Sequence, residues 1–432
     1  MDPAAERAVE AGRGDPVSSL ETVRTPPQNS AESSAAAEEW KTTFRPLFAV
    51  SFCGACLGAL ALLIMFHAPA VNVPIFFFTT RPAMVWFGLL LPFLIVGALG
   101  VRRRWFVLGC AFWIVSLLAC EDAMAWFRPF HENARTKFEA SQMAYLSFSK
   151  AHGNDIEVLD VPLRIVSWNV DAGKMGAAQA VAQLAALRPD VALLEEFAWG
   201  EHTAMFDAFH ASPFFRDYHV TSPLEHENSL GIVSRFPITE AREVPLPWNS
   251  AVWQVHFAPD RRITCVVLHL SAPDLKTQLL RGWTVAGLRK ALDARRGQLE
   301  KVREMLGLQV DGSPILLTGD FNVPSNYPDL SIATAGMKDA FATKGYGWGK
   351  TAGMRWIERV ARPDMIFVPS DATVFDAFAA PTTYSDHCPV IAEISIPVPR
   401  LEPVELPPAK QDVPAAPEPV VPKKRTWKPK QP

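Results

Sequence analysis

PILLTGDFN, at residues 314–322, joins a short apolar run to a polar tetrapeptide. Residues 314–318 are typical of a buried strand, and the Gly319 that follows marks its exit. Asp320 and Asn322 lie two residues apart, so their side chains share one face at the end of that strand. SDH, at residues 385–387, presents a second carboxylate beside an imidazole, just ahead of another strand pattern at 390–394. A metal ion or a phosphate group can use both sets of side chains.

The segment around these motifs, residues 155–396, alternates between strand and helix patterns. Strand patterns occupy 163–168, 191–194, 230–233, 251–257 and 263–270, and helical composition occupies 177–187 and about 277–306. Two β-α-β passages at the start, a block of strands and a return to β-α-β predict sheets that are covered by helices.

The first third of the chain carries three apolar runs, at 46–66, 83–101 and 105–120. Each is near the roughly 20 residues that a bilayer requires. A signal peptide is disfavoured because about forty polar residues precede the first run, and a buried core helix is disfavoured because polar interruptions are few. We therefore expect a membrane anchor of about three transmembrane helices over residues 46–127.

Charge predicts how this anchor is oriented. Arg102, Arg103 and Arg104 lie in the short turn between the second and third runs, where the positive-inside rule places them in the cytoplasm. The sequence thus predicts a multi-pass protein of the inner or plasma membrane, with everything after about residue 128 outside. Glu121 and Asp122 make the third crossing the weakest part of this prediction.

The two ends of the chain predict disorder. Residues 1–45 are rich in Ala, Glu, Ser and Pro without periodicity, and residues 397–432 form a Pro-rich tail with a basic end. The net charge of -3 argues against a chain that coats nucleic acid by charge alone, although a local basic patch would suffice for binding. Four of the six cysteines lie in or beside the apolar runs, so no disulfide framework is implied.

Seven motifs in order give the segment 155–396 a family resemblance. They are SWN (167–169), PDVALLEE (189–196), LGIVSRFPI (230–238), LHL (268–270), GDFN (319–322), RPD (362–364) and SDH (385–387). With them the segment resembles the endonuclease/exonuclease/phosphatase superfamily, which includes deoxyribonuclease I, exonuclease III and the neutral sphingomyelinases. The resemblance implies an α/β fold, a four-layer α/β/β/α sandwich of two packed mixed sheets flanked by helices.

The resemblance also implies a metal site. Asn169, Glu196 and Asp386 correspond to its ligands, and their hard oxygen atoms suit Mg²⁺ or Mn²⁺. The family usually has Gln-Glu where this chain has Glu195-Glu196, so Glu196 is the expected ligand and Glu195 is expected to face the other way. Taken without the family, a Glu at a strand end is more often a solvated surface group.

A general base is implied by the last motif. His387, with Asp386 or another carboxylate orienting its ring, resembles the family's unit that deprotonates a water for in-line attack on phosphorus. Asp320 corresponds to the second catalytic carboxylate, which orients water or helps to bind metal.

Two further side chains are expected to contact the phosphate. Asn322 corresponds to a donor that stabilises the phosphorane-like charge. His269 would hydrogen-bond a phosphate oxygen, with Asp364 fixing its orientation. A lone histidine in an apolar strand is by default a hydrogen-bonded core residue, and only the other motifs reverse that interpretation.

These expectations combine into a membrane-anchored, divalent-metal-dependent phosphoesterase whose partners are the lipid bilayer and a phosphate-ester substrate. Nucleic acid, phospholipid and small phosphate esters all fit, so nuclease and phospholipid or sphingolipid phosphodiesterase stay open. A non-catalytic membrane scaffold that keeps the fold is the alternative of another class. The presence of a metal ligand and a base together disfavours it, because a binding module needs neither.

Overall fold

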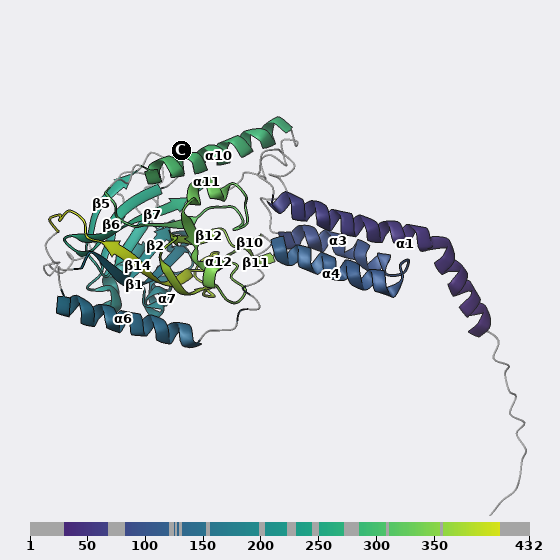
Figure 1. Cartoon of the computed structure of the whole chain (residues 1–432), viewed down its shortest axis with the longest axis horizontal. Coiled ribbons are helices and arrows are strands. Elements are labelled where there is room, and N and C mark those ends of the chain that lie inside the picture. Colours follow the sequence, from purple (N-terminus) through teal and green to yellow (C-terminus); the bar gives the residue numbers. More distant parts are fainter. Residues whose placement is uncertain are drawn as a thin grey trace, which may run out of the picture.

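The computed structural model describes residues 30–67, 83–120, 125, 128, 132–152, 156–197, 204–222, 230–243, 250–271, 285–307, 311–354 and 357–406. A helical bundle extends from a larger β-sheet sandwich (Figure 1). The bundle consists of α1 (Ser30–His67), α3 (Ala83–Gly97) and α4 (Arg103–Cys120). α1 begins inside the segment 1–45 for which composition predicts disorder, whereas residues 1–29 and most of the predicted C-terminal tail lie outside the described residues.

The bundle corrects the expected number of membrane spans. Among the described residues, one helix is long and apolar enough to cross a membrane, over Thr42–Met65 of α1. α3 has 15 residues, about 23 Å of helix at about 1.5 Å per residue, which is short of the roughly 30 Å hydrocarbon core. α4 has 18 residues but begins with Arg103 and Arg104, which shorten its apolar stretch. The expectation of about three spanning helices is therefore wrong for the described part of the chain.

A long helix that the sequence patterns did not predict connects the bundle to the sandwich. This helix, α6 (Glu132–His152), packs against three strands of one sheet. Phe138 is its most deeply buried side chain and contacts Phe375 and Arg164 of that sheet.

The first sheet has six strands in the order β13-β14-β1-β2-β4-β3. β1 and β2 are parallel and are joined through α7 (Ala177–Leu187), and the other pairs are antiparallel. The strand bounds are Val158–Asn169 (β1), Val191–Glu195 (β2), His219–Thr221 (β3), Gly231–Ser234 (β4), Thr373–Ala379 (β13) and Val390–Pro399 (β14).

The second sheet repeats this plan in the order β5-β6-β7-β8-β12-β9. Its parallel pair, β7 and β8, is joined through α10 (Val285–Gly307). The strand bounds are Ile238–Glu243 (β5), Ser250–Ala258 (β6), Arg261–His269 (β7), Ile315–Asp320 (β8), Met337–Asp339 (β9) and Asp364–Pro369 (β12). A separate hairpin pairs β10 (Ala352–Met354) with β11 (Ile357–Ala361).

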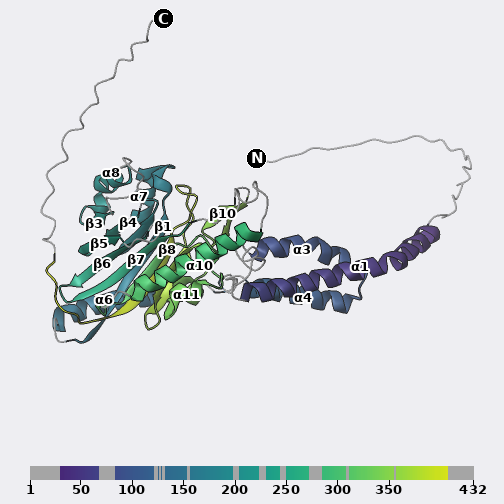
Figure 2. The ribbon, with the colours of Figure 1, turned by 90° about the horizontal axis from the view of Figure 1, so that it is seen from above.

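Three apolar clusters define four layers. The central cluster joins the facing sides of the two sheets, for example through Ile165 and Trp253. A second lies between the outer side of the first sheet and α7 and α8 (Ala204–Ala211), and a third between the second sheet and α10 and α11 (Leu330–Thr334). Helices therefore cover both outer faces of two packed mixed sheets, as the sequence predicts, and Figure 2 shows the same layers from above.

Candidate active site

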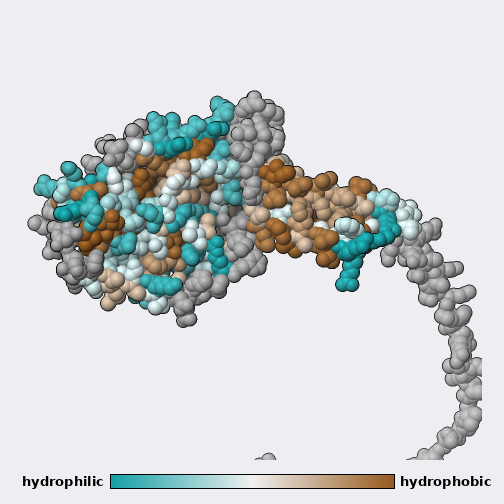
Figure 3. Space-filling view, viewed as in Figure 1, coloured by the Kyte–Doolittle hydropathy of each residue, from teal (hydrophilic) through white to brown (hydrophobic). Residues whose placement is uncertain are grey.

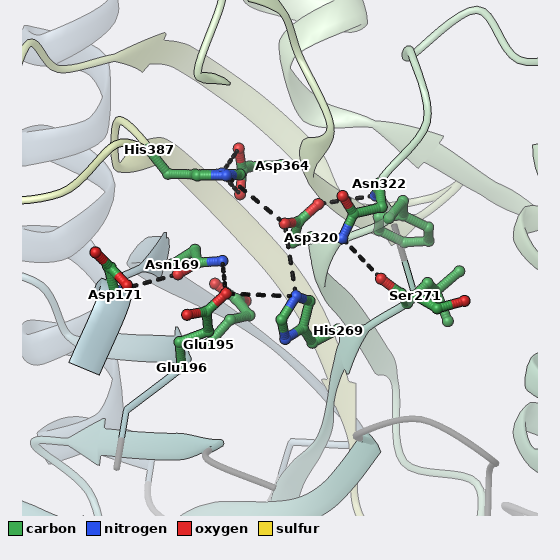
Figure 4. Close-up of polar contacts among 12 residues, drawn as sticks. Asn169, Asp171, Glu195, Glu196, His269, Ser271, Asp320, Asn322, Asp364 and His387 are labelled. Carbon is green, nitrogen blue, oxygen red and sulfur yellow. Dashed lines mark hydrogen bonds and ion pairs between the residues drawn. The ribbon is translucent and has the colours of Figure 1, made fainter. Parts of the chain in front are cut away.

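Strand register alone brings most of the predicted residues to one edge of the sandwich. In the first sheet, Asn169 at the end of β1 pairs with Glu195 at the end of β2. In the second sheet, Asp320 at the end of β8 pairs with His269 on one side and with Asp364 on the other. Because both parallel pairs end at this edge, their terminal side chains meet across the seam between the sheets (Figure 4).

The first-sheet half of the site consists of Asn169 and Glu196. The amide nitrogen Nδ2 of Asn169 donates to Oε1 of Glu196 at 3.1 Å, and the backbone N–H of Asp171 donates to Asn169 Oδ1 at 3.1 Å. Glu196 has a left-handed φ of 49°, and its side chain is 21% exposed. The turn after β2 thus presents a carboxylate that a hydrated ion can reach.

Glu195, which strand alternation was expected to turn away from Glu196, lies inside the sandwich on the side of the site, near Asp320 and Asp364 of the second sheet. It is fully buried and accepts a hydrogen bond from Ser167 Oγ at 3.1 Å, while its Oε2 has no hydrogen-bond partner among the described residues. Burial raises its pKa well above the usual range, and the nearby Asp364 and Asp320 carboxylates raise it further. A neutral carboxylic acid is close in shape to the glutamine that the family usually has at this position.

The second-sheet half consists of Asp320 and Asp364, and His387 reaches it from the loop before β14 of the first sheet. Nδ1 of His387 lies 3.0 and 2.9 Å from the two carboxylate oxygens of Asp364, which is fully buried and also accepts a hydrogen bond from Thr351 Oγ1. Asp364 therefore orients His387, and its expected pairing with His269 is wrong. Asp386 is exposed, and its closest hydrogen bond, at 3.5 Å, comes from Ser385 Oγ. The orienting carboxylate is thus Asp364 and not the adjacent Asp386.

Asp320 lies between the two histidines of the site. Its Oδ2 is 3.9 Å from Nε2 of His387 and 3.8 Å from Nε2 of His269, and its Oδ1 accepts from the backbone N–H of Asn322 at 2.8 Å. Burial raises the pKa of Asp320, and the Asp364 carboxylate adds to this. Asn322 Nδ2 donates to the carbonyl of Leu270 at 2.7 Å, which leaves the second N–H of this amide for a ligand.

His269 joins the two halves. Its Nε2 lies 3.7 Å from Oε1 of Glu196 as well as 3.8 Å from Asp320, and its buried Nδ1 has no hydrogen-bond partner among the described residues.

The carboxylates also set the proton affinity of His387. Burial lowers its pKa, but the charges of Asp364 and Asp320 and the hydrogen bond to Asp364 outweigh burial and bring the pKa well above the usual range. His387 consequently holds its proton to a higher pH than a solvated histidine does.

Two sets of side chains at this edge fit a divalent metal. Asn169 and Glu196 offer hard oxygen donors of the kind that Mg²⁺ and Mn²⁺ prefer. Asp320, Asp364 and His387 form a second set, whose possible ligand atoms all lie within 4.8 Å of one another. In that second set, the carboxylate of Asp364 already forms hydrogen bonds with His387 and Thr351.

Comparison with known proteins identifies the fold's family. A sequence model of the Endonuclease/Exonuclease/phosphatase family matches residues 166–387, just over half of the chain. The chain belongs to the Endonuclease/Exonuclease/phosphatase family. It is therefore a metal-dependent hydrolase that acts on phosphate esters, the chemistry of this family. Among curated proteins, no match was found.

Several solved structures are similar to this chain at low sequence identity. Humanized D. rerio TDP2 shares 18% identity at a TM-score of 0.43, covering 54% of this chain and 98% of its own. A Neisseria 3′ phosphatase, NExo, bound to a product DNA hairpin, shares 18% at 0.42, covering 54% and 98%. The mannosyl-6-phosphatase of Bacteroides thetaiotaomicron VPI-5482 shares 18% at 0.39, covering 54% and 99%. None of these similarities bears on the substrate of this family member.

Two supporting residues were not predicted as part of the site. Ser385 Oγ donates to the carbonyl of Asn169 at 2.7 Å and accepts from the backbone N–H of His387 at 3.0 Å, so it ties the SDH loop to β1. Its place in the SDH motif was a usable signal. Thr351 had none, because backbone hydrogen bonds with the distant residues Ala361 and Cys388 hold it beside Asp364.

Proposed function

We propose that this chain is a membrane-anchored phosphoesterase in which a His–Asp pair activates the water that attacks phosphorus. The observation that carries the proposal is the His387–Asp364 pair, which faces Asp320 and lies across His269 from Glu196. Bases and acids of this type, gathered at one edge with an accessible carboxylate, match the needs of phosphate-ester hydrolysis.

The metal is assigned to the first-sheet half. Asn169 and Glu196 would hold Mg²⁺ or Mn²⁺, with Asp386 as a further ligand on the SDH loop that Ser385 ties to Asn169. When bound, the metal supplies positive charge that stabilises the developing charge on the phosphate oxygens. The accessibility of Glu196 supports this choice over the second set, where Asp364 is fully buried and already hydrogen-bonded.

Proton transfer is assigned to the second-sheet half. His387 Nε2 takes the proton of the attacking water, while Asp364 holds the Nδ1–H and stabilises the imidazolium that forms. Asp320, 3.9 Å from Nε2, orients that water. His269 and the free N–H of Asn322 donate hydrogen bonds to the phosphate oxygens as negative charge develops.

Exposed apolar surface on the bundle supports membrane anchoring. Soluble proteins rarely expose contiguous apolar patches larger than a few hundred Å². Here, apolar residues cover most of the visible surface of the bundle between a polar turn and the sandwich (Figure 3). The large exposed side chains include Leu47, Val50, Leu57, Ile64, Leu89, Phe93, Leu108 and Ile114.

The polar turn supports an outward-facing catalytic domain. Arg102, Arg103 and Arg104 are exposed, and the neighbouring Gly100 contacts Phe48 near the start of the span in α1, at the end of the bundle away from the sandwich (Figures 1 and 3). By the positive-inside rule this end of α1, the one candidate span among the described residues, is cytoplasmic, and its other end, toward the sandwich, is outside. Alkaline phosphatase fused after residue 150 should be active, and green fluorescent protein at the same place should be dark. The reverse result would put the domain in the cytoplasm.

Hydrolysis by the full-length chain tests the enzymatic proposal. We expect purified protein to cleave p-nitrophenyl phosphate or bis(p-nitrophenyl) phosphate with Mg²⁺ or Mn²⁺, to lose activity with EDTA and to regain it when the metal is restored. Release of nitrophenol from neither ester, at any metal concentration, would favour the non-catalytic scaffold.

A further inference from the structure

The chain that leaves the bundle is fixed to the sandwich almost at once. Ala125 lies five residues after the end of α4, at most about 18 Å away at full extension. Its carbonyl accepts from the backbone N–H of Gly347 at 3.1 Å. Arg128 then donates to the carbonyls of Gly345 at 3.1 Å and Ala342 at 2.8 Å.

These contacts satisfy the end of a helix. Arg128 also donates to the carbonyl of Phe341 at 3.3 Å, so its guanidinium covers the last turn of α12 (Ala340–Lys344). Helix C-termini have unpaired carbonyls and favour a nearby cation. The junction between bundle and sandwich is therefore specified by a charged side chain.

The segment held by this junction leads directly into the catalytic edge. It runs from Gly345 to Ala352, where Thr351 donates to Asp364 and its carbonyl accepts from the backbone N–H of Cys388 at 2.8 Å. Ala352 then pairs with His387. Within eight residues the chain passes from the anchor junction to the proposed general base.

The path of the chain through α6 and β1 places the first-sheet part of the catalytic edge, at the end of β1, on the side of the sandwich that faces the bundle. α6 has 21 residues and β1 has 12, which correspond to about 31 Å of helix away from the junction and about 40 Å of strand back. Phe138, early in α6, contacts Arg164 in the second half of β1. This contact fits a strand that runs antiparallel to the helix, back toward the junction. β1 therefore ends, at Asn169, toward the bundle, and both ribbon views show β10 on that side (Figures 1 and 2).

The rim of the site carries side chains suited to a lipid surface. Trp348, in the junction segment, is 48% exposed, and Met175, in the loop after β1, is 53% exposed. Lys174 beside it is exposed but is paired with Asp171. Tryptophan favours the headgroup level of a bilayer.

From this geometry we infer that the catalytic edge faces the bilayer and that the substrate is a phosphate ester carried by a lipid of that surface. The inference rests on the proposed function, and adds the docking surface and the substrate class to it. Tethering then keeps the site at a high effective concentration of headgroups. A soluble polyanion such as single-stranded DNA would gain nothing from an edge held against the membrane.

Photo-crosslinking tests the orientation without relying on catalysis. p-Benzoylphenylalanine replaces Trp348, Phe214 or Leu108 in the full chain, reconstituted in phosphatidylcholine/phosphatidylglycerol nanodiscs. Phe214 is the matched control, an exposed aromatic that packs on Tyr218, whose hydroxyl donates to the carbonyl of Pro189 at the opposite end of β2. Leu108 is exposed on α4 and reports insertion of the bundle.

We expect lipid adducts at positions 108 and 348 and none at 214. Adducts at 108 without adducts at 348 would overturn the orientation and leave the anchor in place. The absence of adducts at 108 would remove the anchor and the inference with it.

A substrate comparison tests the lipid assignment. The full chain is placed in nanodiscs of phosphatidylcholine, phosphatidylglycerol and phosphatidylethanolamine, and is offered bis(p-nitrophenyl) phosphate or a single-stranded DNA oligonucleotide in solution. We expect release of lipid headgroup or phosphate from the protein's own disc. Cleavage of the soluble diester or the oligonucleotide with intact lipid would overturn the inference while the proposed function stands. Failure to cleave any of them would contradict the proposed function itself.

Discussion

The two halves of the site differ in their access to water more than in residue type. Both supply carboxylates, but the Glu196 side chain in the first-sheet half is 21% exposed, whereas those of Asp320 and Asp364 in the second are 2% and 0% exposed. An accessible carboxylate can exchange water for a hydrated ion, whereas buried ones in a hydrogen-bond network fix a histidine and raise its pKa. This difference in burial supports the proposal that one half binds the metal and the other transfers the proton.

Loss of the accessible carboxylate should have the largest effect. Glu196→Ala should lower kcat/KM for a nitrophenyl phosphate ester by about a thousandfold or more, equivalent to about 4 kcal/mol of lost charge stabilisation. The circular dichroism spectrum should not change. Glu300→Ala, at an exposed position of α10, is the control. Full activity of Glu196→Ala would remove this residue from the site.

Loss of the base should follow. His387→Ala should reduce kcat by about two to four orders of magnitude, the range for a missing general base. The exposed His210 of α8 provides a matched His→Ala control that should keep normal turnover. If His387→Ala retained near-normal turnover, water activation would move to Asp320.

Neutralising the orienting carboxylate should change the pH profile. A base must be deprotonated, so kcat/KM of the wild type should rise with pH through the raised pKa of His387, above the ordinary value of 6.5. Asp364→Asn removes a charge that raises this pKa. The acidic limb should therefore move to lower pH, while kcat falls about 10- to 100-fold, as for other partners that orient a functional histidine. If the acidic limb of the pH profile did not move, Asp364 would not be the partner that raises the pKa of His387.

The smallest effect should come from removing the Thr351 hydroxyl, which donates a hydrogen bond to Asp364. Thr351→Val keeps the shape of the side chain and should lower kcat by about tenfold or less, equivalent to about 1.4 kcal/mol. Thr343→Val in α12, whose hydroxyl donates to the carbonyl of Asp339 at 2.6 Å, controls for loss of a threonine hydrogen bond at an exposed position away from the site. Equal effects of both substitutions would deny Thr351 a place in the network.

Local sequence patterns predicted the elements and the gathering of the site. The helix expected at 177–187 coincides with α7, and the strand expected at 263–270 nearly coincides with β7. Asn169 and Asp320 end strands as expected, because an apolar run followed by a polar residue locates a strand exit without knowledge of the rest of the fold. His269 was expected inside a strand that runs to residue 270, and it ends β7 instead. Sheet topology then brings these exits together.

Pairings between distant segments could not be predicted in the same way. Asp364 and His387 are 23 residues apart and meet only after β12 and β14 enter different sheets. Sequence adjacency favoured Asp386, and the family motif favoured His269 as the partner of Asp364. The predicted number of spans was also wrong. The apolar run that begins at residue 83 continues to residue 101, but α3 ends at Gly97, which packs against Phe52 of the distant helix α1.

Binding of Mn²⁺ tests the division between the halves most directly. Electron paramagnetic resonance of free Mn²⁺ gives the affinity of the wild type, Glu196→Gln and His387→Ala without reference to activity. We predict that Glu196→Gln weakens binding at least about tenfold and that His387→Ala changes it less than about twofold. The opposite pattern would place the metal among Asp320, Asp364 and His387, and would contradict the account.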